Sequence, residues 1–142
     1  MKILIDADGC PVVDLAIKIA KTHSIKCIIL CDTSHYFNRD GAETITVSKG
    51  ADSVDFKLVN IAIAGDIVIT QDYGLAAMCL AKNAIVLSQD GMVYNSSNID
   101  TLLMSRHIAK KARMSGVRVK GAKKRTTEQD MAFKASLEAI LT

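Results

Sequence analysis

Met1-Lys-Ile-Leu-Ile-Asp-Ala-Asp-Gly-Cys-Pro11 is the stretch of this 142-residue sequence that decides the fold. A short apolar run that breaks into Asp6-Ala-Asp8-Gly is typical of a buried parallel strand with two carboxylates at its carboxyl end. Proline is suited to the first turn of a helix, where its missing N–H leaves no hydrogen bond unmade. We therefore expect a strand over residues 2–6 and a helix that starts at Pro11.

Short apolar runs alternate with amphipathic segments along the rest of the chain. The strand patterns fall at residues 26–31, 44–48, 67–70 and 84–87, and the helical patterns at residues 54–64, 75–82, 98–115 and 127–141. Because helices connect successive strands, the pattern predicts an α/β fold of three layers, α/β/α, with a mainly parallel five-stranded sheet. We expect a single domain over residues 1–142.

The composition favours a globular protein without disulfides or membrane spans. Hydrophobic residues make up 49% of the chain and charged residues 23%, which is ordinary for a folded domain. The four cysteines are scattered without a CxxC pair, as expected for reduced thiols. No apolar run approaches the length of a membrane span, and the first strand begins at residue 2, so we expect a cytoplasmic protein without membrane contact.

Positive charge is concentrated in one segment of the chain. Residues 110–125 contain 8 Lys and Arg and no Asp or Glu, which leaves the remainder of the chain at −5 although the whole carries +3. Such a segment is either a solvated linker or a contact for a polyanion. We predict nucleic-acid contact, with candidate substrate-binding residues Lys120, Lys123, Lys124 and Arg125.

Carboxylates follow the strands that are expected at the centre of the sheet. Asp6 and Asp8 follow the first strand and Asp72 follows the fourth, while Asp55 lies early in the helix before the fourth strand. If the strand order is 3-2-1-4-5, Asp6, Asp8 and Asp72 converge at the edge of the sheet where ligands bind in open parallel sheets. Crowded carboxylates repel one another unless a cation compensates, and their hard oxygen atoms suit Mg²⁺ or Mn²⁺. We predict metal-assisted phosphodiester hydrolysis, with Asp6, Asp8 and Asp72 as catalytic residues.

A second polar group follows the second strand, at Asp32-Thr-Ser-His35. Ser34 and His35 are candidates for binding a phosphate or donating a proton, although a loop Ser-His pair without a third partner is a poor nucleophilic triad. We include Asp32, Ser34 and His35 among the candidate substrate-binding residues.

The whole chain resembles the YaiI/YqxD family of bacterial proteins, which is related to PIN-like and NYN-like nuclease domains. The matching motifs are Ile5-Asp-Ala-Asp-Gly-Cys-Pro11, Asp32-Thr-Ser-His35, Gly50-Ala-Asp-Ser-Val-Asp55, Gly65-Asp-Ile-Val-Ile-Thr-Gln-Asp72 and Leu75-Ala-Ala. The resemblance implies a PIN-like fold of strand order 3-2-1-4-5 and a Mg²⁺ or Mn²⁺ site whose ligands are Asp6, Asp8, Asp55 and Asp72. Our prediction is accordingly a metal-dependent nuclease that acts on RNA in preference to DNA.

Two other functions fit part of the same pattern. Asp6-Ala-Asp8 is similar to the first motif of haloacid-dehalogenase-type phosphatases, in which the first Asp is the nucleophile and the second the acid. Against this, Gly65-Asp66 precedes the fourth strand instead of following it, and no motif lysine is evident. The other alternative is a PIN-like module that binds RNA or a protein without cutting.

Overall fold

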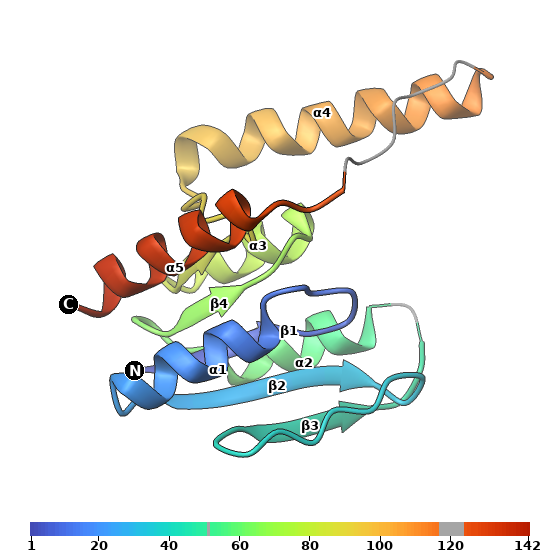
Figure 1. Ribbon diagram of the computed structural model, residues 1–142. Helices are drawn as coiled ribbons and strands as arrows, with labels where there is room; N and C mark the ends of the chain where they lie inside the picture. The colour runs from blue at the N-terminus through green and yellow to red at the C-terminus, as the bar shows by residue number, and fades with distance from the viewer. Residues whose placement is uncertain (51, 117–123) are drawn as a thin grey trace.

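The computed structural model describes residues 1–50, 52–116 and 124–142. At its centre is a five-stranded sheet of order β3-β2-β1-β4-β5 in which every strand pair is parallel (Figure 1). This confirms the predicted fold class and strand order. The strands are β1 (Lys2–Asp6), β2 (Lys26–Asp32), β3 (Glu43–Val47), β4 (Ile67–Ile69) and β5 (Ile85–Leu87).

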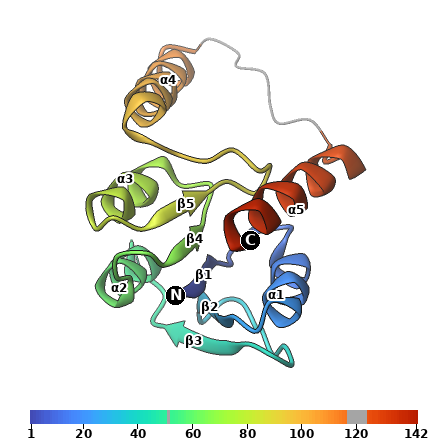
Figure 2. The ribbon, with the colours of Figure 1, turned by 90° about the vertical axis from the view of Figure 1, so that its left-hand side faces the viewer.

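Helices cover both faces of the sheet and complete the three layers. The helices of the described residues are α1 (Val13–Thr22), α2 (Ser53–Ile61), α3 (Tyr73–Ala81), α4 (Ser96–Met114) and α5 (Thr127–Leu141). Viewed along the sheet in Figure 2, α1 and α5 lie on one face and α2 and α3 on the other, with α4 outside α3. None of these helices combines the length and the apolar character that a membrane-spanning segment needs.

The side chains of β1 alternate between the two halves of the core. Ile3 and Ile5 pack under α1 and α5, whereas Leu4 packs under α2 and α3. All three are fully buried, because a central parallel strand is covered on both faces. The unbroken apolar run at the start of the chain is explained by this double burial.

The last helix, α5, completes the core on one face of the sheet. Its Phe133 and Leu137 are fully buried and pack into the cluster that contains Ile3 and Ile5. Thr126 caps the helix, and the Gln129 side chain accepts a hydrogen bond from the Thr126 backbone N–H, so the two residues form a capping box. The two ends of the chain therefore pack together.

The start of the first helix differs from our expectation. Helix α1 begins at Val13 rather than at Pro11, because the chain first makes a tight turn in which the Cys10 N–H donates to the Ala7 carbonyl. Gly9 adopts a positive φ of 74° in this turn, a conformation that glycine reaches without steric cost. The turn sets the direction in which Asp8 leaves the strand end.

At the opposite, amino end of the sheet, a buried carboxylate is paired with the first strand. Asp66 is 1% exposed and accepts hydrogen bonds from the backbone N–H groups of Lys2 and Ile63 and from the ammonium of Lys2. Burial alone would raise the pKa of this carboxyl, but the hydrogen bonds from Lys2 and Ile63 outweigh it and lower the pKa. Asp66 therefore has a structural partner remote from the other acids.

Candidate functional site

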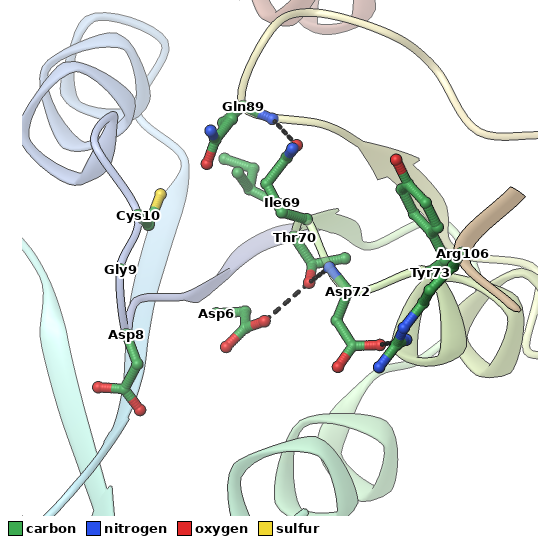
Figure 3. Close-up of a pocket in the computed structure, with 11 residues that line it drawn as sticks. Asp6, Asp8, Gly9, Cys10, Ile69, Thr70, Asp72, Tyr73, Gln89 and Arg106 are labelled. Atoms are coloured by element: carbon green, nitrogen blue, oxygen red, sulfur yellow. Dashed lines mark hydrogen bonds and ion pairs between the residues drawn. The ribbon is translucent and has the colours of Figure 1, made fainter. Parts of the chain in front are cut away.

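The candidate site lies where the chain leaves β1 and β4 in different directions. These two strands are neighbours, and the helices that follow them, α1 and α3, cover opposite faces of the sheet. Such a switch point opens a crevice at the carboxyl ends of the strands. The crevice here is a cleft of about 490 Å³ (Figure 3). It is lined by Asp6, Asp8, Gly9, Cys10, Ile69, Thr70, Gln71, Asp72, Tyr73, Gln89 and Arg106.

Thr70 links the two central acids across the switch point. Thr70 is 2% exposed. Its hydroxyl donates to Asp6 Oδ2 at 2.7 Å, and the oxygen of that hydroxyl accepts from the Asp72 backbone N–H at 3.0 Å. The buried Tyr94 hydroxyl donates to the Thr70 carbonyl at 3.2 Å. One side chain thus orients Asp6 and also shapes the turn that carries Asp72.

Asp72 is held by the start of α3 and by a cation from α4. Its Oδ1 caps the helix by accepting from the Leu75 backbone N–H at 3.1 Å, and Arg106 Nη1 lies 3.5 Å from the same oxygen. The side chains of Asp6 and Asp72 point to the same side of the cleft (Figure 3). The structure therefore brings these two predicted residues together, with a guanidinium at their edge.

Negative charge accumulates between these acids and Asp55 of α2. Burial raises the pKa of Asp6, and the charges of Asp72 and Asp8 raise it further. The hydrogen bond from Thr70 opposes this rise. Burial raises the pKa of Asp55 to about 6, with contributions from the charges of Asp72 and Asp6 and from a hydrogen bond with Asp72. Burial is the larger cause of both shifts, and repulsion between the carboxylates adds to it.

Asp8 belongs to a second group on the side of β2. Its Oδ2 accepts from the Asp32 backbone N–H at 3.1 Å, and its Oδ1 lies 2.8 Å from His35 Nδ1. This Oδ1 is buried and accepts no hydrogen bond of good geometry from the described residues. Within the described ranges, Asp8, Asp32 and His35 are the group of acidic and histidine side chains whose ligand atoms all lie within 4.8 Å of one another.

Ser34 completes the second group by binding Asp32. Its backbone N–H donates to Asp32 Oδ1 at 2.9 Å and its hydroxyl bonds the same oxygen, while His35 Nδ1 lies 3.3 Å away. The hydrogen bonds from Ser34 lower the pKa of the Asp32 carboxyl, because they favour the charged form. The predicted residues are thus divided between an Asp6–Asp55–Asp72 group and an Asp8–Asp32–His35 group.

The basic segment that we predicted to bind substrate is only partly described. Lys120 and Lys123 lie outside the described residues. Lys124 is exposed. The guanidinium of Arg125 donates at 2.7 Å to Asp130 and Asp90 and to the Gln89 carbonyl, so it joins α5 to a residue on the rim of the cleft.

Sequence reasoning missed two residues that shape the site, Thr70 and Arg106. Thr70 could have been found as a polar residue directly after an apolar strand and two positions before an acid. Arg106 had no such signal, because its approach to Asp72 depends on how α4 packs on α3.

Comparison with known proteins places the chain in a family. A family model described as "Uncharacterized BCR, YaiI/YqxD family" matches residues 4–142. The chain belongs to the YaiI/YqxD family. A UPF0178 protein of Exiguobacterium sibiricum is 51% identical over 142 residues, covering 100% of this chain and 97% of that protein. Another, from Ruminiclostridium cellulolyticum, is 50% identical over 137 residues, covering 96% of this chain and 90% of that protein.

No solved structure gives a significant match. The description of the YaiI/YqxD family names no reaction, so the chemistry of the cleft is what bears on function. The resemblance that we inferred from the motifs is confirmed at the level of the family.

Proposed function

We propose that this protein is a metal-dependent nuclease that hydrolyses phosphodiester bonds and acts on RNA in preference to DNA. The observation that supports the proposal best is the convergence of Asp6 and Asp72 at the switch point, with Asp55 close enough that the charges of both raise its pKa. Asp8 enters the same cleft from the other side. We propose Asp6, Asp8, Asp55 and Asp72 as ligands of Mg²⁺ or Mn²⁺.

The donor set fits such an ion. The groups are carboxylate oxygens, which hard divalent cations prefer. The raised pKa values of Asp6 and Asp55 reflect burial and mutual repulsion, both of which a cation would offset. Asp8 Oδ1 is buried and accepts no hydrogen bond of good geometry from the described residues, although His35 Nδ1 lies 2.8 Å away. These observations support the metal site independently of the family.

The surrounding residues have separate roles in the proposed reaction. When bound, Mg²⁺ or Mn²⁺ would acidify a water molecule and stabilise negative charge on the phosphodiester. Thr70 and the Leu75 N–H hold Asp6 and Asp72 in fixed orientations. His35, whose Nδ1 lies 2.8 Å from Asp8 Oδ1, is placed beside the cleft to deliver a proton to the leaving oxygen.

A phosphatase with Asp6 as nucleophile and Asp8 as acid is less well supported. Asp8 interacts with Asp32 and His35 on the β2 side, whereas Asp6 interacts with Thr70 on the β4 side. The described residues that line the cleft include no lysine. A phosphatase of this type would form a covalent aspartyl-phosphate on Asp6 with a small phosphoester, and a metal-dependent nuclease would not.

The test compares cleavage by the wild type and by Asp6→Asn. Purified protein is incubated with single-stranded and structured RNA and DNA in the presence of Mg²⁺ or Mn²⁺. We expect metal-dependent cleavage, faster on RNA, that Asp6→Asn and Asp72→Asn abolish. The matched control is Asp14→Asn, an exposed acid on α1 that pairs with Arg39. Equal cleavage by Asp6→Asn and the wild type would refute the proposal.

Thermal unfolding provides a readout that does not depend on turnover. A ligand at 100 times its dissociation constant stabilises the folded state by about 2.7 kcal/mol, so Mn²⁺ should raise the Tm of the wild type and of Asp14→Asn. The same ion should raise the Tm of Asp6→Asn far less. A non-catalytic binding module would show the metal shift without cleavage, and a protein without the proposed site would show neither.

A further inference from the structure

The packing face of α4 becomes cationic where the helix passes the cleft. Ile99 is buried and Leu103 is partly buried where α4 packs on α3. Steps of three and four residues continue this line to Arg106, Lys110 and Arg113, and such spacings lie on one face of a helix. We call these three residues the cationic stripe. The face of α4 that packs on α3 in the first turns of the helix thus carries positive charge in the later turns.

The stripe begins in the candidate site. Arg106 lines the cleft that contains Asp6 and Asp72, and it also lines a neighbouring hollow that contains Asp55. Its guanidinium lies beside the Asp72 carboxylate (Figure 3) at 3.5 Å. The Arg106 side chain is 60% exposed, so nothing encloses it in this position. Among the three cations of the stripe, Arg106 is the one that lines the cleft.

The other two cations extend away from the cleft without acidic partners. Within the described ranges, no carboxylate forms an ion pair with Lys110 or Arg113, and both residues are exposed. The second half of α4 reaches beyond the helices that pack on the sheet (Figure 1). The stripe spans about 10 Å of helix axis from residue 106 to residue 113. It therefore offers several positive charges in a row outside the cleft.

The cleft and the stripe together favour a long, flexible polyanion. A cleft of about 490 Å³ has the size of a site for a small molecule, so it admits a nucleotide or two but not a duplex. A ligand that ends inside the cleft would leave Lys110 and Arg113 unused. A single strand can enter the cleft and continue along α4, with its phosphates near the stripe. Such contacts are electrostatic and do not depend on base sequence.

We infer that Arg106, Lys110 and Arg113 form a phosphate-binding track that holds single-stranded nucleic acid as it leaves the carboxylate cleft. Arg106 moves from Asp72 to the strand when the strand binds. The inference rests on the proposed nuclease function and names the substrate class for that site.

The test is the salt dependence of binding to a fluorescent single-stranded oligoribonucleotide, measured by anisotropy in EDTA so that no strand is cut. Each phosphate contact on a single strand contributes about 0.7 to the slope of log K against log salt concentration. The variant Lys110→Ala/Arg113→Ala should therefore lose about 1.4 from the magnitude of this slope. The matched control is Lys111→Ala/Lys134→Ala, which removes the same charge from exposed positions outside the stripe. Circular dichroism checks that both variants are folded.

The possible outcomes separate this inference from the proposed function. A loss of slope confined to the stripe variant supports the track. Equal losses in both double variants would assign the effect to overall charge and overturn the track, as would duplex RNA that binds with the same slope. If the wild type cuts RNA but the stripe variant keeps the full slope, the track is overturned while the nuclease stands. A wild type that neither binds nor cuts nucleic acid overturns both.

Discussion

Replacing Thr70 by Val tests whether one hydroxyl organises the site. Valine keeps the shape of the buried side chain but removes the donor to Asp6 and the acceptor for the Asp72 N–H. A hydrogen bond to a charged group contributes about 1.5–3 kcal/mol and a neutral one about 0.5–1.5 kcal/mol. We expect Thr70→Val to lower the free energy of unfolding by about 2–4 kcal/mol at neutral pH. The Tm should fall by roughly 3 °C for each kcal/mol.

The loss of unfolding free energy in Thr70→Val should depend on pH in one direction. Burial raises the pKa of Asp6 and the Thr70 hydroxyl opposes that rise, so Thr70→Val should raise this pKa further. A carboxyl whose pKa is higher in the folded state than in the unfolded state destabilises the protein at neutral pH, and this effect disappears as the pH falls through the folded pKa. The deficit of Thr70→Val should therefore shrink as the pH is lowered from neutral towards about pH 4.

Urea unfolding in EDTA, followed by circular dichroism, measures the effect of Thr70→Val. The control is Thr70→Ser, which keeps the hydroxyl and loses a methyl group worth about 1 kcal/mol. We expect Thr70→Ser to retain the pH dependence of the wild type and most of its cleavage activity. A Thr70→Val protein that is as stable as Thr70→Ser at neutral pH would show that the bridge does not hold Asp6.

Three further substitutions test the packing around the site by urea unfolding. Lys2→Met leaves the buried Asp66 without its ammonium partner and should lower the free energy of unfolding by about 3 kcal/mol at neutral pH. Because the pKa of Asp66 is lowered in the folded state, this loss should disappear as the pH falls through that pKa. A loss that does not change with pH would contradict the pairing. Arg125→Lys cannot reproduce three 2.7 Å contacts and should lose about 1–3 kcal/mol, whereas wild-type stability would show that these contacts are dispensable. Gly91→Ala places a Cβ 2.5 Å from the Ala132 carbonyl oxygen at a φ of 89° and should lose more than about 2 kcal/mol, unless α5 shifts without cost.

The sheet and the central acids were predictable because their signals are local. The buried run of β1 and the parallel order place the ends of β1 and β4 at one edge, so the proximity of Asp6 and Asp72 follows from topology. The pairing of Asp8 with Asp32 needed the register of β1 against β2, in which Asp6 lies opposite Leu30. Two positions further along the chain, Asp8 in the turn after β1 and Asp32 at the end of β2 become neighbours, and periodicity alone does not give that register.

Contacts between distant segments were beyond the reach of sequence patterns. Arg106 reaches Asp72 across 34 positions and Arg125 reaches Asp90 across 35. Such pairs depend on how the helices pack. Helix packing depends on side-chain volumes and cannot be deduced from the spacing of hydrophobic residues. Arg125 appeared as one of several cations in a basic run, although the structure shows it bonded to α5 and to the rim of the cleft.

The position of α5 affects when the protein can finish folding during synthesis. Phe133 and Leu137 fill the core beside Ile3 and Ile5, so a helix that follows all five strands in the sequence covers the first of them. Until α5 emerges, the apolar face of β1 stays partly open to solvent. A nascent chain is therefore exposed to aggregation or proteolysis until α5 has been synthesised, and docking of α5 is the step that ends this exposure.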